Sequence, residues 1–258
     1  MFYYLKFSLF KIFFIYYFSI YSQNKIDSII PETAFKIGET LKYEIRYSFI
    51  KGGEASISIG LKKIGYNFYY HIVAKAQTSG IADKFFTIRD VYESYADIIN
   101  VLPIKSIRNI HEENYRRYNE VLFDRKKNKV YSLKSGEHQV PANILDFLSA
   151  FYYARSFVFK DLKKNQVIEL NTFFDEKIFL LKLRYKKIEK IRTKFGKIEC
   201  LLFVPVIEKD GFFKKEKDLK IWVTNEKNLV PIKIRASLLF GTAKCDLIEF
   251  ENLKYKNF

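Results

Sequence analysis

Strict alternation of apolar and polar residues recurs along this chain and places the strongest limit on its fold. In residues 41–49 the apolar side chains lie at every second position, with Lys, Glu, Arg and Ser between them. The same period of two runs through residues 55–61 and 66–74. Successive side chains of a strand point to opposite faces. Each segment therefore predicts a β-strand with one face in the core and one in water.

Residues 50–53, which include two glycines, predict the turn of a hairpin between the first two segments. Turn signals such as Phe195-Gly196-Lys197 separate the later segments. Further strands are predicted at residues 85–95, 104–112, 115–123, 129–133, 166–174, 177–194, 198–207, 218–224, 229–239 and 242–253.

One segment, residues 143–156, has helical periodicity instead. Asn143 is the expected N-cap of this helix, with Asp146 as the acid of a capping box. The predicted apolar stripe consists of Ile144, Phe147, Leu148, Phe151 and Tyr152.

The predicted fold is mainly β. It is a long antiparallel meander curled into a barrel or half-barrel, or folded into a sandwich, with the helix at about 143–156 packed on it. An apolar fraction of 48% is normal for a globular protein and too high for a disordered one. We expect a single β-rich domain over residues 23–258.

Residues 1–22 have the layout of a secretory signal peptide. Lys6 and Lys11 supply positive charge, an apolar run covers residues 12–21, and Ser22 precedes a polar stretch. We expect cleavage after Ser22 and a periplasmic location, with an uncleaved anchor as the alternative. No later stretch reaches about 18 consecutive apolar residues, so no transmembrane span is expected after cleavage.

The net charge of +16 arises from 45 basic and 29 acidic residues, and 35 of the basic ones are lysine. One interpretation is a polyanionic partner. However, Lys, Phe, Tyr and Ile share A/T-rich codons, and the basic pairs are dispersed along the chain. We therefore expect basic residues spread over the surface and no nucleic-acid partner.

Motifs for catalysis and metal binding are absent from the sequence. There is no G-x-S-x-G or H-E-x-x-H pattern, and two cysteines with three scattered histidines have no metal-ligand spacing. We therefore predict no catalytic residue, metal or cofactor. Cys200 and Cys245 lie in apolar, strand-like stretches, which favours two buried free thiols over a disulfide.

An ordered set of short motifs extends over residues 33–254. It comprises residues 35–43 (FKIGETLKY), 53–55, 102–103, 146–155 (DFLSAFYYAR), 174–177, 194–197, 220–223 and 230–232, and the Gly241 turn. In this order and spacing the motifs resemble the DUF3108 family of exported bacterial proteins. Asn225 departs from the pattern, which has an acidic residue in the turn after the Trp strand. The resemblance implies an envelope location and a β-rich fold, with no established activity.

Four residues in these motifs are weak candidates for ligand binding: Glu39, Asp146, Arg155 and Trp222. Each also has a structural interpretation. Glu39 follows Gly38 at the start of a strand, Asp146 caps the helix, and Trp222 fills the core or its rim. Arg155 either meets the helix dipole at the C-terminus or reaches an acidic ligand or a buried carboxylate. We prefer the dipole interpretation.

The expected function is a non-catalytic periplasmic protein that binds an apolar or amphiphilic, lipid-like ligand in its curled sheet. The alternatives are a hydrolase or cell-wall-modifying enzyme, and a structural partner in envelope assembly. A continuous apolar cavity above about 300 Å³ favours the first. A cleft with converging carboxylates favours an enzyme, and a fully filled sheet interior favours the structural partner.

Overall fold

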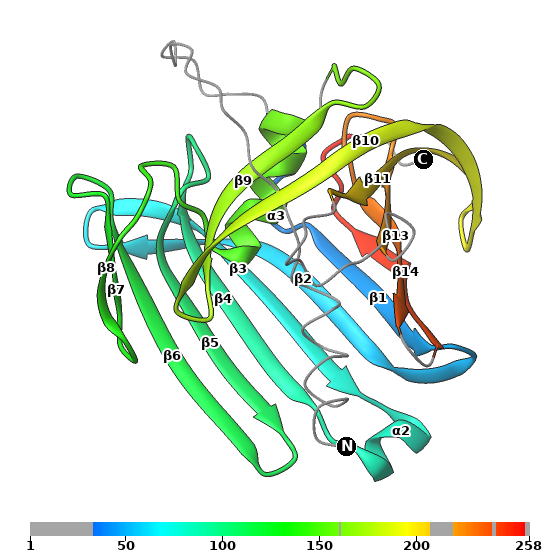
Figure 1. Cartoon of the computed structure of the whole chain (residues 1–258), viewed down its shortest axis with the longest axis horizontal. Helices are drawn as coiled ribbons and strands as arrows, with labels where there is room; N and C mark the ends of the chain where they lie inside the picture. The colour runs from blue at the N-terminus through cyan, green and yellow to red at the C-terminus, as the bar shows by residue number, and fades with distance from the viewer. Residues whose placement is uncertain (1–32, 160, 207–218, 239–240, 256–258) are drawn as a thin grey trace.

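A computed structural model describes residues 33–159, 161–206, 219–238 and 241–255. The predicted signal peptide lies outside these residues. The described chain is mainly β, as predicted, with two short helices and a π-helical turn, η1 (Figure 1). The elements are β1 (Thr40–Tyr47), β2 (Ile50–Ile64), β3 (Asn67–Thr78), α2 (Gly80–Phe85), β4 (Arg89–Asp97), β5 (Pro103–Glu112), β6 (Tyr115–Asp124), β7 (Lys129–Ser132), β8 (Gly136–Gln139), α3 (Phe147–Tyr153), η1 (Ala154–Val158), β9 (Val167–Phe174), β10 (Lys177–Thr193), β11 (Gly196–Pro205), β12 (Leu219–Thr224), β13 (Pro231–Leu238) and β14 (Gly241–Glu251).

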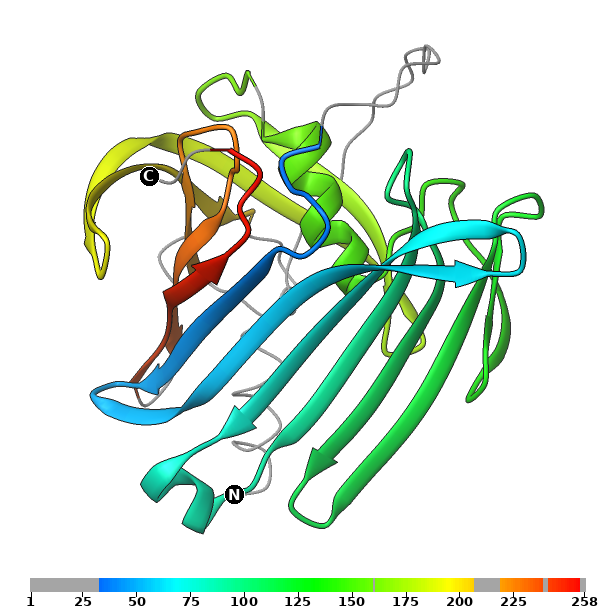
Figure 2. The ribbon, with the colours of Figure 1, turned by 180° about the vertical axis from the view of Figure 1, so that it is seen from behind.

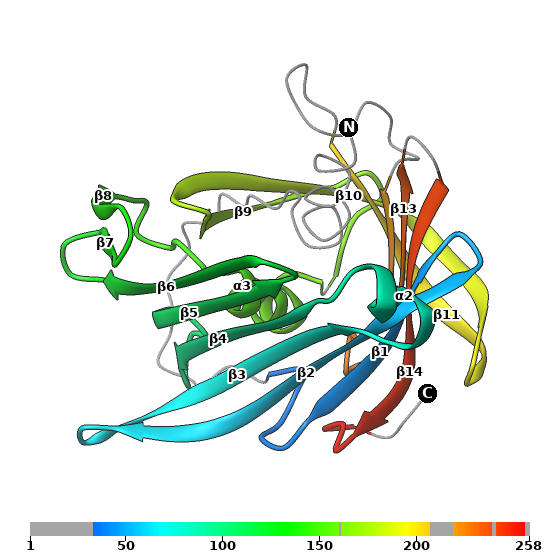
Figure 3. The same ribbon diagram turned by 90° about the horizontal axis from the view of Figure 1, so that it is seen from below.

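All the strands belong to one antiparallel sheet, in the order β8-β7-β6-β5-β4-β3-β2-β1-β14-β13-β12-β11-β10-β9. Two meanders, β1 to β8 and β9 to β14, are joined side by side through β1 and β14. The sheet curls so that β9 and β10 lie opposite β4 to β6, as the view from below shows (Figure 3). Its two edge strands, β8 and β9, are not hydrogen-bonded to each other, so the sheet is not closed.

Helix α3 lies inside this curl (Figures 1 and 2). It starts later than the predicted residue 143, because Asp146 is the N-cap itself. The Asp146 carboxylate accepts the backbone N–H groups of Leu148 and Ser149, and the Ser149 hydroxyl accepts the N–H of Asp146. This is a capping box shifted by three residues from the predicted one. The preceding residues cannot be helical, since Leu145 forms a parallel bridge with Thr172 of β9.

The helix is buried on more than one side, which a single apolar stripe does not predict. Leu148 and Tyr152 belong to the main hydrophobic cluster, which joins β1–β3 to β11–β14. Ala150 and Ala154 pack into a second cluster with β9–β11. Conversely, Phe151 in the predicted stripe is only partly buried. Helix α3 therefore packs inside the curl and connects the two halves of the sheet.

The first hairpin differs from its prediction in the position of the turn. The turn is formed by Ser48 and Phe49, and the predicted turn residues 50–53 lie in β2. Gly53 is needed there because β3 approaches closely: a Cβ at this position would lie 2.1 Å from the carbonyl oxygen of Gln77. The glycine thus reflects tight strand packing rather than a change of chain direction.

Cys200 and Cys245 are buried and unpaired, which confirms the prediction of free thiols. Burial raises the pKa of Cys200 to about 12, so this thiol stays protonated at neutral pH. No helix in the described ranges is long and apolar enough to cross a membrane.

Candidate functional site

The concave face of the sheet changes from apolar to polar between β3 and β4. Strands β1 to β3 present apolar residues such as Leu41, Ile59 and Ile72 to the main cluster. Strands β4 to β6 instead place polar side chains on the same face, because the register pairs Ser94 with Ser106, Tyr92 with Arg108, and Arg108 with Asn119. This polar surface lies next to the N-terminus of α3, where the Ser94 hydroxyl donates to Asp146 over 2.5 Å.

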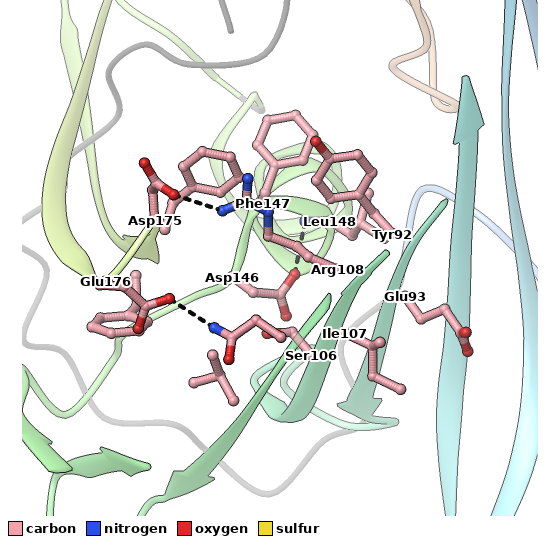
Figure 4. A pocket seen from close by; sticks show the side chains of 14 residues that line it. Tyr92, Glu93, Ser106, Ile107, Arg108, Asp146, Phe147, Leu148, Asp175 and Glu176 are labelled. Carbon is pink, nitrogen blue, oxygen red and sulfur yellow. Dashed lines mark hydrogen bonds and ion pairs between the residues drawn. The ribbon is translucent and has the colours of Figure 1, made fainter. Parts of the chain in front are cut away.

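The turn between β9 and β10 reaches across the opening of the curl onto this surface. Asp175 contacts Arg108 at 3.1 Å and Arg117 at 2.5 Å. Glu176 accepts from the Asn119 amide over 2.7 Å, and its carboxylate lies 3.5 Å from Arg117. We call these five residues the clasp, since they join β9–β10 to β5–β6 where the sheet itself is not closed. Figure 4 shows both sides of the clasp, with Asp175 directed toward Arg108.

Two aromatic rings fix the position of the Arg108 guanidinium. Its central carbon lies 4.3 Å from the ring centre of Phe174 and 5.8 Å from that of Tyr92. Stacking and cation–π attraction favour this planar group over an ammonium. The clasp is therefore an ordered, partly desolvated network.

A small pocket lies between the clasp, β4–β6 and the N-terminus of α3. Asp146 and Arg108 border it, whereas the side chains of Glu93 and Ile107 point away from it (Figure 4). The volume open to the centres of water molecules is about 30 Å³. One water requires about 10–15 Å³ on this measure. The pocket thus accommodates two or three waters and no acyl chain.

The carboxylates around this pocket converge, but each is already held by donors. Asp146 accepts from two backbone N–H groups of α3 and from Ser94. Burial raises the pKa of this carboxyl above its ordinary value. Asp175 and Glu176 are engaged by the clasp. A general acid or base needs a lone pair or proton directed at a substrate, whereas the groups that contact these carboxylates belong to the protein itself.

A serine and a histidine also meet Glu176 of the clasp, which their sequence spacing did not reveal. The Ser135 hydroxyl lies 2.7 Å from Nε2 of His138 and also donates to the Glu176 carboxylate. Because an ionised carboxylate only accepts, the serine proton points to Glu176 and His138 is the donor to Ser135. A catalytic triad has the acid on the other histidine nitrogen. This group therefore lacks the order of a nucleophile, base and orienting acid.

Arg155 and Glu39, two of the four sequence candidates, form a fully buried ion pair. The guanidinium makes a two-point contact, with Nη1 2.5 Å and Nη2 2.9 Å from the Glu39 oxygens. Its Nε and Nη2 also donate to the carbonyl of Asn228, at 3.1 and 2.9 Å. Burial has the largest single effect on the pKa of Arg155 and lowers it, but the charge and hydrogen bonds of Glu39, with smaller contributions from Tyr152 and Tyr43, together raise the pKa above its ordinary value.

This pair corrects the preferred interpretation of Arg155 as a partner of the helix dipole. Both side chains are 0% exposed, and Arg155 lies in η1 and not at a solvated helix end. It joins α3 to the segment before β1, through Glu39, and to the β12–β13 loop, through Asn228. The buried carboxylate, the other option open from the sequence, is the actual partner.

The remaining candidates lie apart from this pair. Trp222 is 9% exposed in the main cluster, and its indole N–H donates to Glu189 over 2.7 Å. Asp146 stands at the opposite end of α3 from Arg155. The structure therefore brings Glu39 and Arg155 together, leaves Asp146 at the pocket, and puts Trp222 in the core.

The clasp was missed in the sequence because its contacts join residues 57 and 67 positions apart. One local signal exists. Strands β4 to β6 carry polar residues at inward positions, such as Asp90, Arg108 and Asn119, where an ordinary strand has apolar ones. A strand that is polar on both faces indicates a buried polar network or a site.

Asp90 is the most unusual titratable group near this surface. It is 1% exposed; Oδ1 accepts the backbone N–H of His111, and Oδ2 has no partner among the described residues. Burial raises the pKa of Asp90 to about 6, from an ordinary 3.8, although the backbone N–H of His111 and the charge of Arg108 oppose this shift. The folded protein thus holds a proton that the unfolded chain releases near pH 4.

We predict that Asp90→Asn stabilises the protein at neutral pH. A carboxyl with a raised folded pKa favours folding at low pH, and this contribution is lost as the pH rises through about 6. The difference in free energy of unfolding between the variant and the wild type should shift in favour of the variant by about 1–3 kcal/mol between about pH 5 and pH 7.5. Urea unfolding at the two pH values measures this. Asp146 also has a raised pKa, but it is present in both proteins, so its pH-dependent contribution cancels when their unfolding free energies are subtracted. An equal difference at both values contradicts the assignment.

Comparison with known proteins gives a family and a fold. The family model described as "Protein of unknown function (DUF3108)" matches residues 42–248. No curated protein matches the chain. A solved beta-barrel-like protein of the domain of unknown function DUF1849 from Brucella abortus is 8% identical, with a TM-score of 0.53 over 84% of this chain and 98% of that one. A DUF1089 family protein from Pseudomonas aeruginosa is 10% identical over 86% of this chain and 98% of that one. Its TM-score of 0.39 is too low to support a fold comparison.

Proposed function

Because this chain belongs to the DUF3108 family, whose function is unknown, we propose its role from the geometry. It is a non-catalytic protein of the cell envelope, exported to the periplasm, that binds an apolar or amphiphilic ligand on the concave side of its sheet. The supporting observation is an aromatic strip inside an open curl. Phe147 and Phe151 lie four residues apart on α3, and both are only partly buried.

The strip continues onto the sheet around the helix. Tyr70 of β3 and Tyr92 of β4 are also partly buried and pack against the main cluster. Aromatic side chains that remain partly exposed inside a concave surface favour binding of an apolar group. The small pocket behind them is too tight for an acyl chain, so the ligand would lie along the strip, with its polar end toward the clasp.

Native mass spectrometry of protein purified from the host envelope tests this proposal. We expect a co-purifying small apolar molecule on the wild type and a clear reduction on Phe151→Ser. Phe49→Ser is the matched control, since Phe49 is 86% exposed on a turn outside the curl. A wild type that carries no such molecule, and takes up none from a lipid extract of the host, would rule out this function.

Export has its own test. If residues 1–22 are a signal peptide, N-terminal sequencing of protein from the host should begin near Gln23. Protein that begins at Met1 and fractionates with the cytoplasm would contradict the envelope location, whatever the ligand experiment shows.

The alternative of a hydrolase rests on Ser135, His138 and Glu176. It is less well supported, because Glu176 holds the serine and not the histidine. Ester hydrolysis that is abolished by Ser135→Ala would favour it over ligand binding.

A further inference from the structure

The hairpin of β2 and β3 projects beyond the rest of the sheet. β1 pairs with β2 only as far as Ser58, and β4 pairs with β3 only from Tyr69 onward. Residues 61–68 therefore form a two-stranded arm without neighbours on either side, and all of them are exposed. The arm extends past the adjacent strands in two perpendicular views (Figures 1 and 3).

Large apolar side chains cover this arm. Tyr66, in the turn at its tip, is 97% exposed, and Phe68 is 48% exposed. Leu61 and Ile64 are 44% and 40% exposed. The arm thus exposes four large apolar side chains within six positions of its tip, with Leu61 and Phe68 on one face and Ile64 on the other. Such exposure is unfavourable unless another surface covers them.

The charge of the arm has one sign. Lys62 and Lys63 lie among these apolar residues, and neither has a carboxylate partner in the described part of the chain. No acidic residue occurs between Glu54 and Asp83, a span that also contains Lys75. Elsewhere the exposed lysines are interspersed with acids, and several, such as Lys42 and Lys129, form ion pairs.

We propose that the tip of this hairpin docks on the surface of an anionic phospholipid bilayer. Tyr66 and Phe68 enter the interface, where amphipathic aromatic rings are favoured. Lys62 and Lys63 meet lipid phosphates, and the two contributions act together, as stable attachment to a bilayer requires. A nucleic acid or an acidic polysaccharide would engage the lysines but leave Leu61 and Ile64 in water. This docking does not depend on the ligand proposed above.

Flotation with phospholipid vesicles tests the docking, using the chain from Gln23, which contains every described residue. Wild type should float with vesicles of phosphatidylcholine and phosphatidylglycerol and bind weakly to phosphatidylcholine alone. The double variant Tyr66→Ser/Phe68→Ser should lose about tenfold or more in partition coefficient. For Lys62→Gln/Lys63→Gln, the partition coefficient should fall about fivefold per lysine at low salt.

Two control variants carry the same kinds of substitution elsewhere. Phe85→Ser removes a ring that is 78% exposed on α2, at the opposite end of β3. Lys163→Gln/Lys164→Gln removes an exposed lysine pair before β9. Both should bind vesicles like the wild type. Wild-type binding by Tyr66→Ser/Phe68→Ser, or an equal loss in the controls, overturns the proposal. A loss confined to the lysine variant indicates a polyanion partner and also overturns it.

Discussion

Replacing Arg155 with lysine is expected to lower the free energy of unfolding by about 3–5 kcal/mol, although the charge is kept. The planar guanidinium of Arg155 donates hydrogen bonds to both oxygens of Glu39 and to the carbonyl of Asn228 at the same time. A lysine ammonium is a single point on a flexible stem and cannot reproduce these directions. Since both partners are 0% exposed, water cannot replace the lost contacts. Urea unfolding followed by circular dichroism measures the loss.

The matched control is Arg235→Lys. Arg235 also pairs with a carboxylate, Asp246, whose two oxygens both accept from Nη2, at 2.6 and 2.7 Å, but the two side chains are 24% and 31% exposed. Partly exposed pairs contribute about 0–1 kcal/mol. If both variants lose the same small amount, Arg155 acts through its charge alone and the buried fork has no special role.

Replacing Tyr152 with alanine should cost about 3–5 kcal/mol of unfolding free energy, the range for truncating a buried aromatic side chain. Tyr152 is 0% exposed, and its ring packs edge-on against Phe35 with 4.6 Å between ring centres. Truncation leaves a cavity between α3, the segment before β1 and the sheet. Denaturant unfolding of the purified variant measures the effect.

Phe151→Ala provides the comparison, because Phe151 neighbours Tyr152 on the helix but is only partly buried. Its loss should be clearly smaller, since less apolar area leaves water at this position. An equal or greater loss for Phe151 would mean that its ring, and not that of Tyr152, anchors α3 in the curl.

The sheet could be predicted from sequence because its determinants are local. The predicted segments 115–123 and 177–194 match β6 and β10 within one residue, since alternation and turn residues are read over a few positions. The start of α3 was missed by a few residues. Both Asn143 and Asp146 are good caps, and the bridge from Leu145 to β9 decides between them.

The polar contacts could not be predicted, because they depend on which distant residues the curl brings together. Glu39 and Arg155 are 116 positions apart, and Arg108 and Asp175 are 67 apart. The motifs that contain Glu39 and Arg155 are both recognisable in the sequence, but neither indicates the other as its partner. The sequence therefore identified Glu39 and Arg155 as candidate residues, but not the ion pair that they form with each other.

The pairing of β1 with β14 has a consequence for biosynthesis. Tyr47 pairs with Ala243, so the edge of β1 meets its neighbour only after about 200 further residues have left the ribosome, roughly 10–40 s at usual elongation rates. Until then Leu41, Tyr43 and Ile45 lie along an unpaired edge, which is a template for wrong strand pairing between nascent chains. Co-translational folding of the first meander alone therefore carries an aggregation risk, and holding the chain unfolded until synthesis is complete avoids it.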